Sequence, residues 1–182
     1  MARTKDTIFV QIASYRDPEL LPTLDDLFDK ASKPDNLKVC IAWQHSKEDK
    51  WDNLDEFKND RRFNIIDIDY KDSRGACWAR HHIQKFYNNE TYSLQLDSHH
   101  RFIKNWDEEC IKMYKLAIKQ GYPKPLLTTY LGSYFPEKDP KDRQEDVWYL
   151  CFDRIAPEGP LHTKPHTLEE WRTLEGPIPH RF

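Results

Sequence analysis

Apolar residues along the first two thirds of the chain form short runs that alternate with segments of helical spacing. The runs predict strands at 7–13, 38–44, 63–70, 92–96, 125–130 and 147–152. The spacing predicts helices at 19–31, 76–87 and 107–120, with Leu20, Leu24, Leu27 and Phe28 on the inner face of the first and Cys110, Met113, Tyr114 and Ala117 facing inward on the last. This alternation predicts an α/β fold with a Rossmann-type, mostly parallel sheet flanked by helices.

The pattern weakens towards the C-terminus, where prolines and charges replace periodic apolar positions. A chain of 182 residues has the length of one ordinary domain. We therefore expect a single α/β domain over 1–182, with its core at 7–155 and a proline-rich tail at 156–182.

Composition narrows the classes of protein. Hydrophobic residues make up 38% and charged residues 32%, and the net charge is −3, which favours a soluble globular protein and gives no general reason to bind nucleic acid. Residues 1–6 lack the apolar core of a signal peptide, and no run of apolar residues is long enough to span a membrane. We expect a cytoplasmic protein, with its four widely spaced cysteines reduced and mostly buried rather than binding zinc.

Asp97 and His99 come at the end of the predicted strand 92–96. Side chains two apart on a strand leave the same face, so this carboxylate and this imidazole could bind one divalent cation, and the pair suits Mn²⁺ better than Ca²⁺. The alternative is that Asp97 caps the next helix and His99 is a surface histidine.

A second group of residues opens the helix that precedes this strand. Arg74 and Arg80 flank Gly75, which permits close approach of a ligand to the backbone, at a helix N-terminus. Combined with a cation at Asp97 and His99, these groups would bind a diphosphate from two sides. In isolation, two surface arginines and an ordinary glycine at a helix start explain the segment better than an anion site does.

Three segments, Gln11–Glu19, Gly75–Arg80 and Leu94–Phe102, resemble in order and spacing the cytoplasmic-type polypeptide N-acetylglucosaminyltransferases, which include a hydroxyproline-modifying enzyme. The resemblance covers about residues 7–155. A fainter likeness extends to the Golgi polypeptide N-acetylgalactosaminyltransferases, in which an arginine-rich segment also precedes Asp-Ser-His.

The resemblance implies a GT-A-like fold and transfer of a sugar, expected to be N-acetylglucosamine, from a UDP-sugar to a protein hydroxyl. It implies retention of anomeric configuration and dependence on Mn²⁺ or a similar cation, with Asp97 and His99 as metal ligands. The donor site it implies comprises Ala13, Ser14, Tyr15 and Arg16 at the uridine, Arg74 and Arg80 at the diphosphate or sugar, and Gly75, Trp78, Gln95 and Ser98 beside them.

Family chains continue past a position like Phe182 into a second half that contacts the acceptor and supplies a further histidine to the metal. We therefore expect 1–182 to be the donor-binding half, in which His162, His166 or His180 could replace that histidine. No side-chain nucleophile is identifiable, and none is needed if the acceptor attacks from the leaving-group face.

Three other functions are compatible with the same residues. The chain could bind a nucleotide-sugar or a protein partner without turnover. It could be a metal-dependent hydrolase or nucleotidyltransferase that combines Asp97 and His99 with Asp67 or Asp69. It could also be a structural α/β domain without a site.

Overall fold

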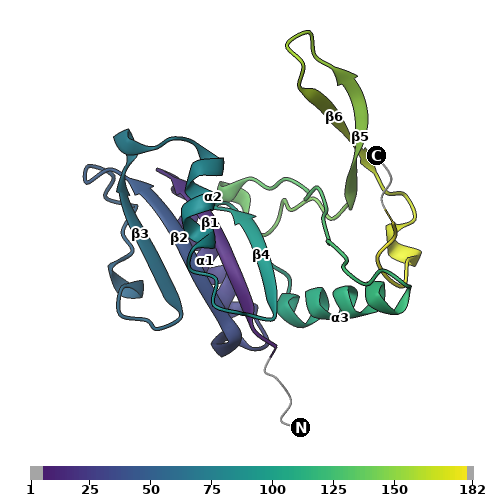
Figure 1. Ribbon diagram of the computed structural model, residues 1–182, viewed down its shortest axis with the longest axis horizontal. Helices are drawn as coiled ribbons and strands as arrows, with labels where there is room; N and C mark the ends of the chain where they lie inside the picture. Colours follow the sequence, from purple (N-terminus) through teal and green to yellow (C-terminus); the bar gives the residue numbers. More distant parts are fainter. Residues whose placement is uncertain (1–5, 180–182) are drawn as a thin grey trace. The chain divides into compact units, whose positions relative to one another are not determined.

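The computed structural model of this protein describes residues 6–179 and divides into two compact units, the first ending at Glu108 and the second beginning at Glu109. The expectations for most of the N-terminal segment and for His180 fall on residues 1–5 and 180–182, outside the described part. Figure 1 shows the elements of both units.

The first unit is a four-stranded sheet with two helices. In chain order its elements are β1 (Ile8–Tyr15), α1 (Leu20–Asp29), β2 (Leu37–His45), β3 (Phe63–Asp69), α2 (Ala76–Gln84) and β4 (Tyr92–Asp97). The strand order is β3-β2-β1-β4 and every neighbouring pair is parallel. The predicted α/β, Rossmann-type parallel sheet is confirmed, with element ends within about three residues of those expected.

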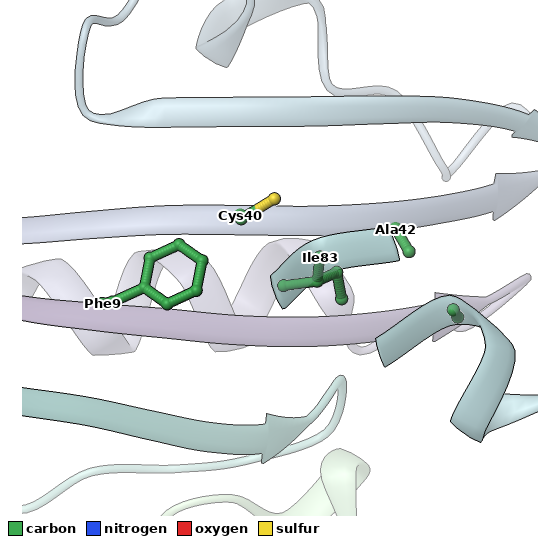
Figure 2. Close-up of a cluster of buried hydrophobic side chains, with 5 residues drawn as sticks. Phe9, Cys40, Ala42 and Ile83 are labelled. Carbon is green, nitrogen blue, oxygen red and sulfur yellow. The ribbon is translucent and has the colours of Figure 1, made fainter. Parts of the chain in front are cut away.

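The two central strands are mainly apolar because both of their faces are covered. Val10, Ile12, Val39 and Ile41 are fully buried. Helices α1 and α2 lie on opposite faces of the sheet (Figures 1 and 2). Parallel strands covered on both sides need such continuous apolar runs rather than alternation.

Helix α2 covers the face of the sheet that carries Phe9, Cys40 and Ala42, which pack with Ala79 and Ile83 of the helix (Figure 2). Burial raises the pKa of the Cys40 thiol to about 12, so this cysteine stays protonated. This packing fixes where α2 begins relative to β1 and β4, and therefore where Arg74, Gly75 and Arg80 lie.

The second unit contains most of α3 (Trp106–Lys119), which begins in the first unit, and an antiparallel pair formed by β5 (Trp148–Ile155) and β6 (Leu161–Thr167). The strand predicted at 125–130 is wrong, since only a bridge between Tyr130 and Trp148 forms there. Pro125 has no N–H to donate to a ladder. Strand β6 falls within the segment expected to be a proline-rich tail, and it accommodates Pro165 at the edge of a two-stranded sheet.

Two expectations about side chains also fail. Cys77 and Cys110 are exposed, Cys151 is half-buried and only Cys40 is buried, so the cysteines are not mostly buried. Cys110 therefore does not face inward on α3, whereas Ala117 does. Within residues 6–179 we find no helix with the length and apolar character needed to cross a bilayer.

Candidate functional site

The carboxyl ends of β1 and β4 lie side by side. The two strands pair in parallel, with Ala13 opposite Asp97 in the register. The loop that follows β1 and the segment that follows β4 therefore emerge at the same edge of the sheet, where ligands bind in folds of this kind.

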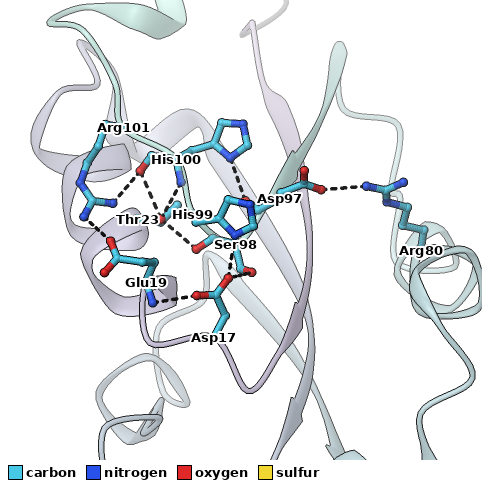
Figure 3. Close-up of polar contacts among 9 residues, drawn as sticks. All are labelled: Asp17, Glu19, Thr23, Arg80, Asp97, Ser98, His99, His100 and Arg101. Atoms are coloured by element: carbon cyan, nitrogen blue, oxygen red, sulfur yellow. Dashed lines mark hydrogen bonds and ion pairs between the residues drawn. The ribbon is translucent and has the colours of Figure 1, made fainter. Parts of the chain in front are cut away.

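Asp97 is the last residue of β4, and its side chain is 57% exposed. Its Oδ1 accepts a hydrogen bond from Nη2 of Arg80 on α2 at 2.9 Å (Figure 3). The Arg80 Nε is buried and has no hydrogen-bond partner among the described residues. Arg80 thus places one positive charge against Asp97 while part of its guanidinium remains unsatisfied.

His99 is also exposed, but its imidazole turns to another partner. Its Nδ1 lies 2.8 Å from Oδ2 of Asp17, in the loop between β1 and α1 (Figure 3). The same Oδ2 accepts a 2.6 Å hydrogen bond from the Ser98 hydroxyl, and Oδ1 accepts one from the Glu19 backbone N–H at 2.9 Å. Burial acts to raise the pKa of Asp17, but these hydrogen bonds outweigh it and lower that pKa, so the carboxylate is ionised.

The first turns of α1 hold the backbone of residues 98–101 in place. The Thr23 hydroxyl donates to the Ser98 carbonyl at 2.9 Å and accepts from the His100 N–H at 2.9 Å. Arg101 donates to Glu19 at 2.5 Å. The segment that carries Ser98 and His99 is therefore fixed to the helix although it has no regular secondary structure (Figure 3).

The loop after β1 contains the four residues expected at a uridine. Ala13 is half-buried, Ser14 is fully buried with a hydroxyl that has no hydrogen-bond partner among the described residues, and Tyr15 is 53% exposed. Arg16 has a positive φ of 48°, and its guanidinium binds both oxygens of the buried Asp49 at 2.5 and 2.8 Å. The hydrogen bond from Arg16 lowers the pKa of Asp49, so Arg16 serves the loop's own structure here.

The remaining residues expected at the donor lie at the start of α2 and on β4, and they differ in exposure and in their contacts. Arg74 is exposed and has no hydrogen-bond or ion-pair partner within residues 6–179, and Gly75 has a φ of 88° with open space where a Cβ would lie. Trp78 packs against the core and meets the His82 ring edge to face, so it is half-buried. Gln95 is exposed on β4, opposite Gln11 of β1.

Comparison with known protein families gives a match over residues 7–64 and 50–182, which together span most of the chain, to the family described as Glycosyltransferase (GlcNAc). The chain belongs to this GlcNAc glycosyltransferase family. No curated protein and no solved structure matches the chain. The match agrees with the glycosyltransferase expected from the sequence, at the level of the family.

A glycosyltransferase of this fold that uses a cation needs ligands at the edge described above. Asp97 has an exposed oxygen that makes no contact with Arg80, and His99 has a second ring nitrogen, Nε2, with no hydrogen-bond partner among the described residues. A carboxylate oxygen and an imidazole whose other nitrogen meets a carboxylate are a donor set that fits Mn²⁺. Within residues 6–179, however, no group of three or more such side chains gathers, so Asp97 and His99 fit the cation as two ligands only.

The argument from strand alternation does not extend to His99, because β4 ends at Asp97 and residues 98 and 99 form a bend. Asp97 faces α2 and His99 faces the β1–α1 loop (Figure 3). Joint binding of one cation by the two side chains stays a prediction.

The order of the strands in the sheet argues against the alternative of a metal-dependent hydrolase or nucleotidyltransferase. Asp67 and Asp69 are on β3, at the opposite edge of the sheet from β4, and Asp67 lies 2.9 Å from His45. Three strand spacings separate the two edges, about 14 Å. A two-metal site that combines either aspartate with Asp97 is therefore not formed.

Sequence reasoning missed Asp17 and Thr23. Both were visible as polar residues near the start of the first helix, and Asp17 precedes Pro18 two residues after the end of β1. An aspartate before a proline favours a turn in which its side chain accepts from the backbone N–H two residues on, and the Asp17 Oδ1 does accept from the Glu19 N–H. The contact of its second oxygen with His99, 82 residues away, has no signal in the sequence.

Proposed function

We propose that this chain binds UDP-N-acetylglucosamine through a divalent cation and transfers the sugar, with retention, to a protein hydroxyl. The observation that carries the proposal is the position of two side chains at the carboxyl edge of a parallel sheet, in a member of a GlcNAc glycosyltransferase family: Asp97, which pairs with Arg80, and His99, which pairs with Asp17. The GT-A-like fold and the cytoplasmic polypeptide type belong to the same proposal.

Each group would have a distinct task towards the donor. Tyr15 and the adjacent backbone would contact the uridine, with the exposed Tyr15 side chain available for stacking, whereas the fully buried Ser14 would support this loop from within. Arg74 and the N-terminal amides of α2, beside Gly75, would bind diphosphate oxygens. Asp97 and His99 would hold the cation, which when bound offsets negative charge on the departing UDP.

Arg80 would change partners when the donor binds. It pairs with Asp97 in the structure, and it is half-buried with its Nε unsatisfied. A cation on Asp97 would replace the positive charge of Arg80 and leave that guanidinium for the diphosphate or sugar. The chain offers no side-chain nucleophile to this proposal, which leaves attack to the acceptor hydroxyl.

The first experiment is calorimetric titration of the 182-residue chain with UDP-N-acetylglucosamine, once with Mn²⁺ and once with chelator. We expect binding with Mn²⁺ only. Asp97→Ala should abolish it, because the cation loses its carboxylate. Arg74→Ala should weaken it by about 1.5–3 kcal/mol, the contribution of a charge-assisted hydrogen bond.

Two exposed residues away from the site provide matched controls. Asp25→Ala removes a carboxylate from the outer face of α1, and Arg61→Ala removes a guanidinium at the amino end of β3. Both should bind as the wild type does. Equal binding by the wild type, Asp97→Ala and Arg74→Ala would rule out the assigned site.

A second candidate function is donor binding without transfer. It is favoured by the second unit, where β6 is exposed along nearly its whole length and the two-stranded sheet has no layer of buried large side chains among the described residues. Release of UDP in the presence of peptides that contain serine, threonine or hydroxyproline separates the two functions. Metal-dependent binding with no UDP release from any peptide would favour the second.

A further inference from the structure

We infer that Asp17 is a positioning residue that holds His99 in the one neutral form able to bind a cation through Nε2. This inference rests on the proposed function, and it deepens it by naming a residue that acts through His99 rather than on the donor.

Asp17 is anchored more firmly than the histidine it contacts. Its side chain is 17% exposed, against 58% for His99. Both carboxylate oxygens accept hydrogen bonds, Oδ1 from the Glu19 N–H at 2.9 Å and Oδ2 from the Ser98 hydroxyl at 2.6 Å. Three donors, counting His99 Nδ1, therefore fix the direction of this carboxylate.

The contact determines where the proton of His99 resides. An ionised carboxylate can only accept hydrogen bonds, so at 2.8 Å from Asp17 Oδ2 the Nδ1 must be the donor. In neutral His99 the proton is then on Nδ1, and Nε2 keeps a free lone pair. Nε2 has no hydrogen-bond partner among the described residues, which leaves it available to a ligand from solvent.

Hydrogen bonds from α1 and its first residues hold the backbone on both sides of the Asp17–His99 contact in place. Thr23 of α1 binds the Ser98 carbonyl and the His100 N–H, and Arg101 pairs with Glu19, so the chain on each side of the contact is tied to the same helix. The His99 and His100 rings are stacked with their centroids 6.3 Å apart. A metal-binding histidine whose second nitrogen donates to a carboxylate is held in orientation and made more basic.

Asp17→Asn is the sharpest variant, because it keeps the size of the side chain and removes the charge. An asparagine can present its amide to Nδ1, and the imidazole is then free to take the Nε2–H form, which cannot bind a metal through Nε2. We expect Mn²⁺ to bind about 10- to 100-fold more weakly, measured by calorimetry with the metal alone.

The control is Asp107→Asn. Asp107 is a buried carboxylate of the same unit that accepts hydrogen bonds from the backbone N–H groups of Ser32 and Lys33, both at 2.8 Å. Its loss should lower the free energy of unfolding without changing Mn²⁺ affinity. A loss of affinity in both variants would mean that general destabilisation, not Asp17, causes the effect, and would overturn the inference.

A metal-free measurement tests the inference independently of the proposed function. Long-range ¹H–¹⁵N correlation spectra of ¹⁵N-histidine-labelled protein distinguish the two neutral tautomers, and His99→Gln assigns the resonance among the eight histidines. We expect the Nδ1–H form in the wild type and a shift towards Nε2–H in Asp17→Asn. An Nε2–H form in the wild type would overturn the inference even if Asp17→Asn failed to fold.

The two failures are distinguishable. If the wild type shows the Nδ1–H form but binds neither Mn²⁺ nor the donor, the positioning by Asp17 is upheld and the proposed function fails. If the wild type binds Mn²⁺ and Asp17→Asn binds it equally well with an unchanged tautomer, the proposed function stands and the role of Asp17 is refuted.

Discussion

At the scale of single residues, the notable feature of the site is that Asp97 already has a positive partner. Its ion pair with Arg80 is formed at 2.9 Å between two partly exposed side chains. A cation that binds Asp97 must therefore compete with a guanidinium. Arg80 should therefore weaken the binding of a metal ion alone at Asp97. It should strengthen the binding of a metal ion that carries a diphosphate, because the guanidinium can then pair with the phosphate oxygens.

Arg80→Ala should separate these two effects. Exposed ion pairs contribute about 0.2–1 kcal/mol, so removing Arg80 should tighten binding of Mn²⁺ alone by up to about fivefold. The same change should weaken binding of UDP-N-acetylglucosamine with Mn²⁺, because one positive group near the diphosphate is lost. Calorimetry with and without the nucleotide-sugar measures both effects.

Arg80→Lys supplies the control for charge. It keeps the positive charge but lacks the planar fork of arginine, so binding of Mn²⁺ alone should stay near that of the wild type. If Arg80→Ala weakened the binding of bare Mn²⁺, Arg80 would instead support the geometry of Asp97.

At the scale of elements, the start of α1 determines the shape of the segment after β4. A single hydroxyl, that of Thr23, satisfies the Ser98 carbonyl and the His100 N–H, and Thr23 itself is fully buried. The position of His99 therefore depends on a helix that begins almost 80 residues earlier in the chain.

Thr23→Val should lower the free energy of unfolding by about 1–3 kcal/mol, because valine keeps the shape but leaves two backbone groups buried without partners. Urea denaturation followed by circular dichroism measures the change. Thr23→Ser retains the hydroxyl and should recover most of the loss. Equal destabilisation by both variants would show that the methyl group, and not the hydroxyl, is the important part of Thr23.

The elements of the first unit could be predicted from sequence because apolar runs buried on both faces and helices with one apolar face have local signatures. Leu20, Leu24 and Leu27 are all fully buried as the spacing predicts. The strand at 125–130 could not be judged in this way, because an apolar run becomes a strand only where a partner strand is available. The contacts of Asp17 and Thr23 join residues 75 to 82 positions apart, which no local pattern encodes.

At the scale of the whole molecule, the two units differ in how their backbones are protected. Strands β1 and β2 are central in a sheet covered by helices on both faces, whereas β5 and β6 form a two-stranded sheet, extended only by the Tyr130–Trp148 bridge, and β6 is almost entirely exposed. Local opening costs least free energy where few apolar contacts are lost. The molecule therefore has one unit of high and one of low local stability.

Native-state hydrogen exchange tests this difference. Amides of β1 and β2 should exchange slowest, near the free energy of global unfolding, and those of β5 and β6 should exchange orders of magnitude faster. Mass spectrometry of peptic peptides distinguishes the two groups. Equal protection of β5–β6 and β1–β2 would show that the second unit is covered by packing that its exposed surface does not indicate.

The direct pairing of β1 with β4, which sets Ala13 opposite Asp97, also affects which parts of the chain can vary in length during evolution. Neighbouring strands lie about 4.8 Å apart, and backbone hydrogen bonds maintain that spacing. If the proposed donor binds here, the sheet, rather than flexible loops, would set the distance between its base and its diphosphate. Connections at the amino ends of the strands, such as residues 30–36, are free to lengthen or shorten while that distance stays constant.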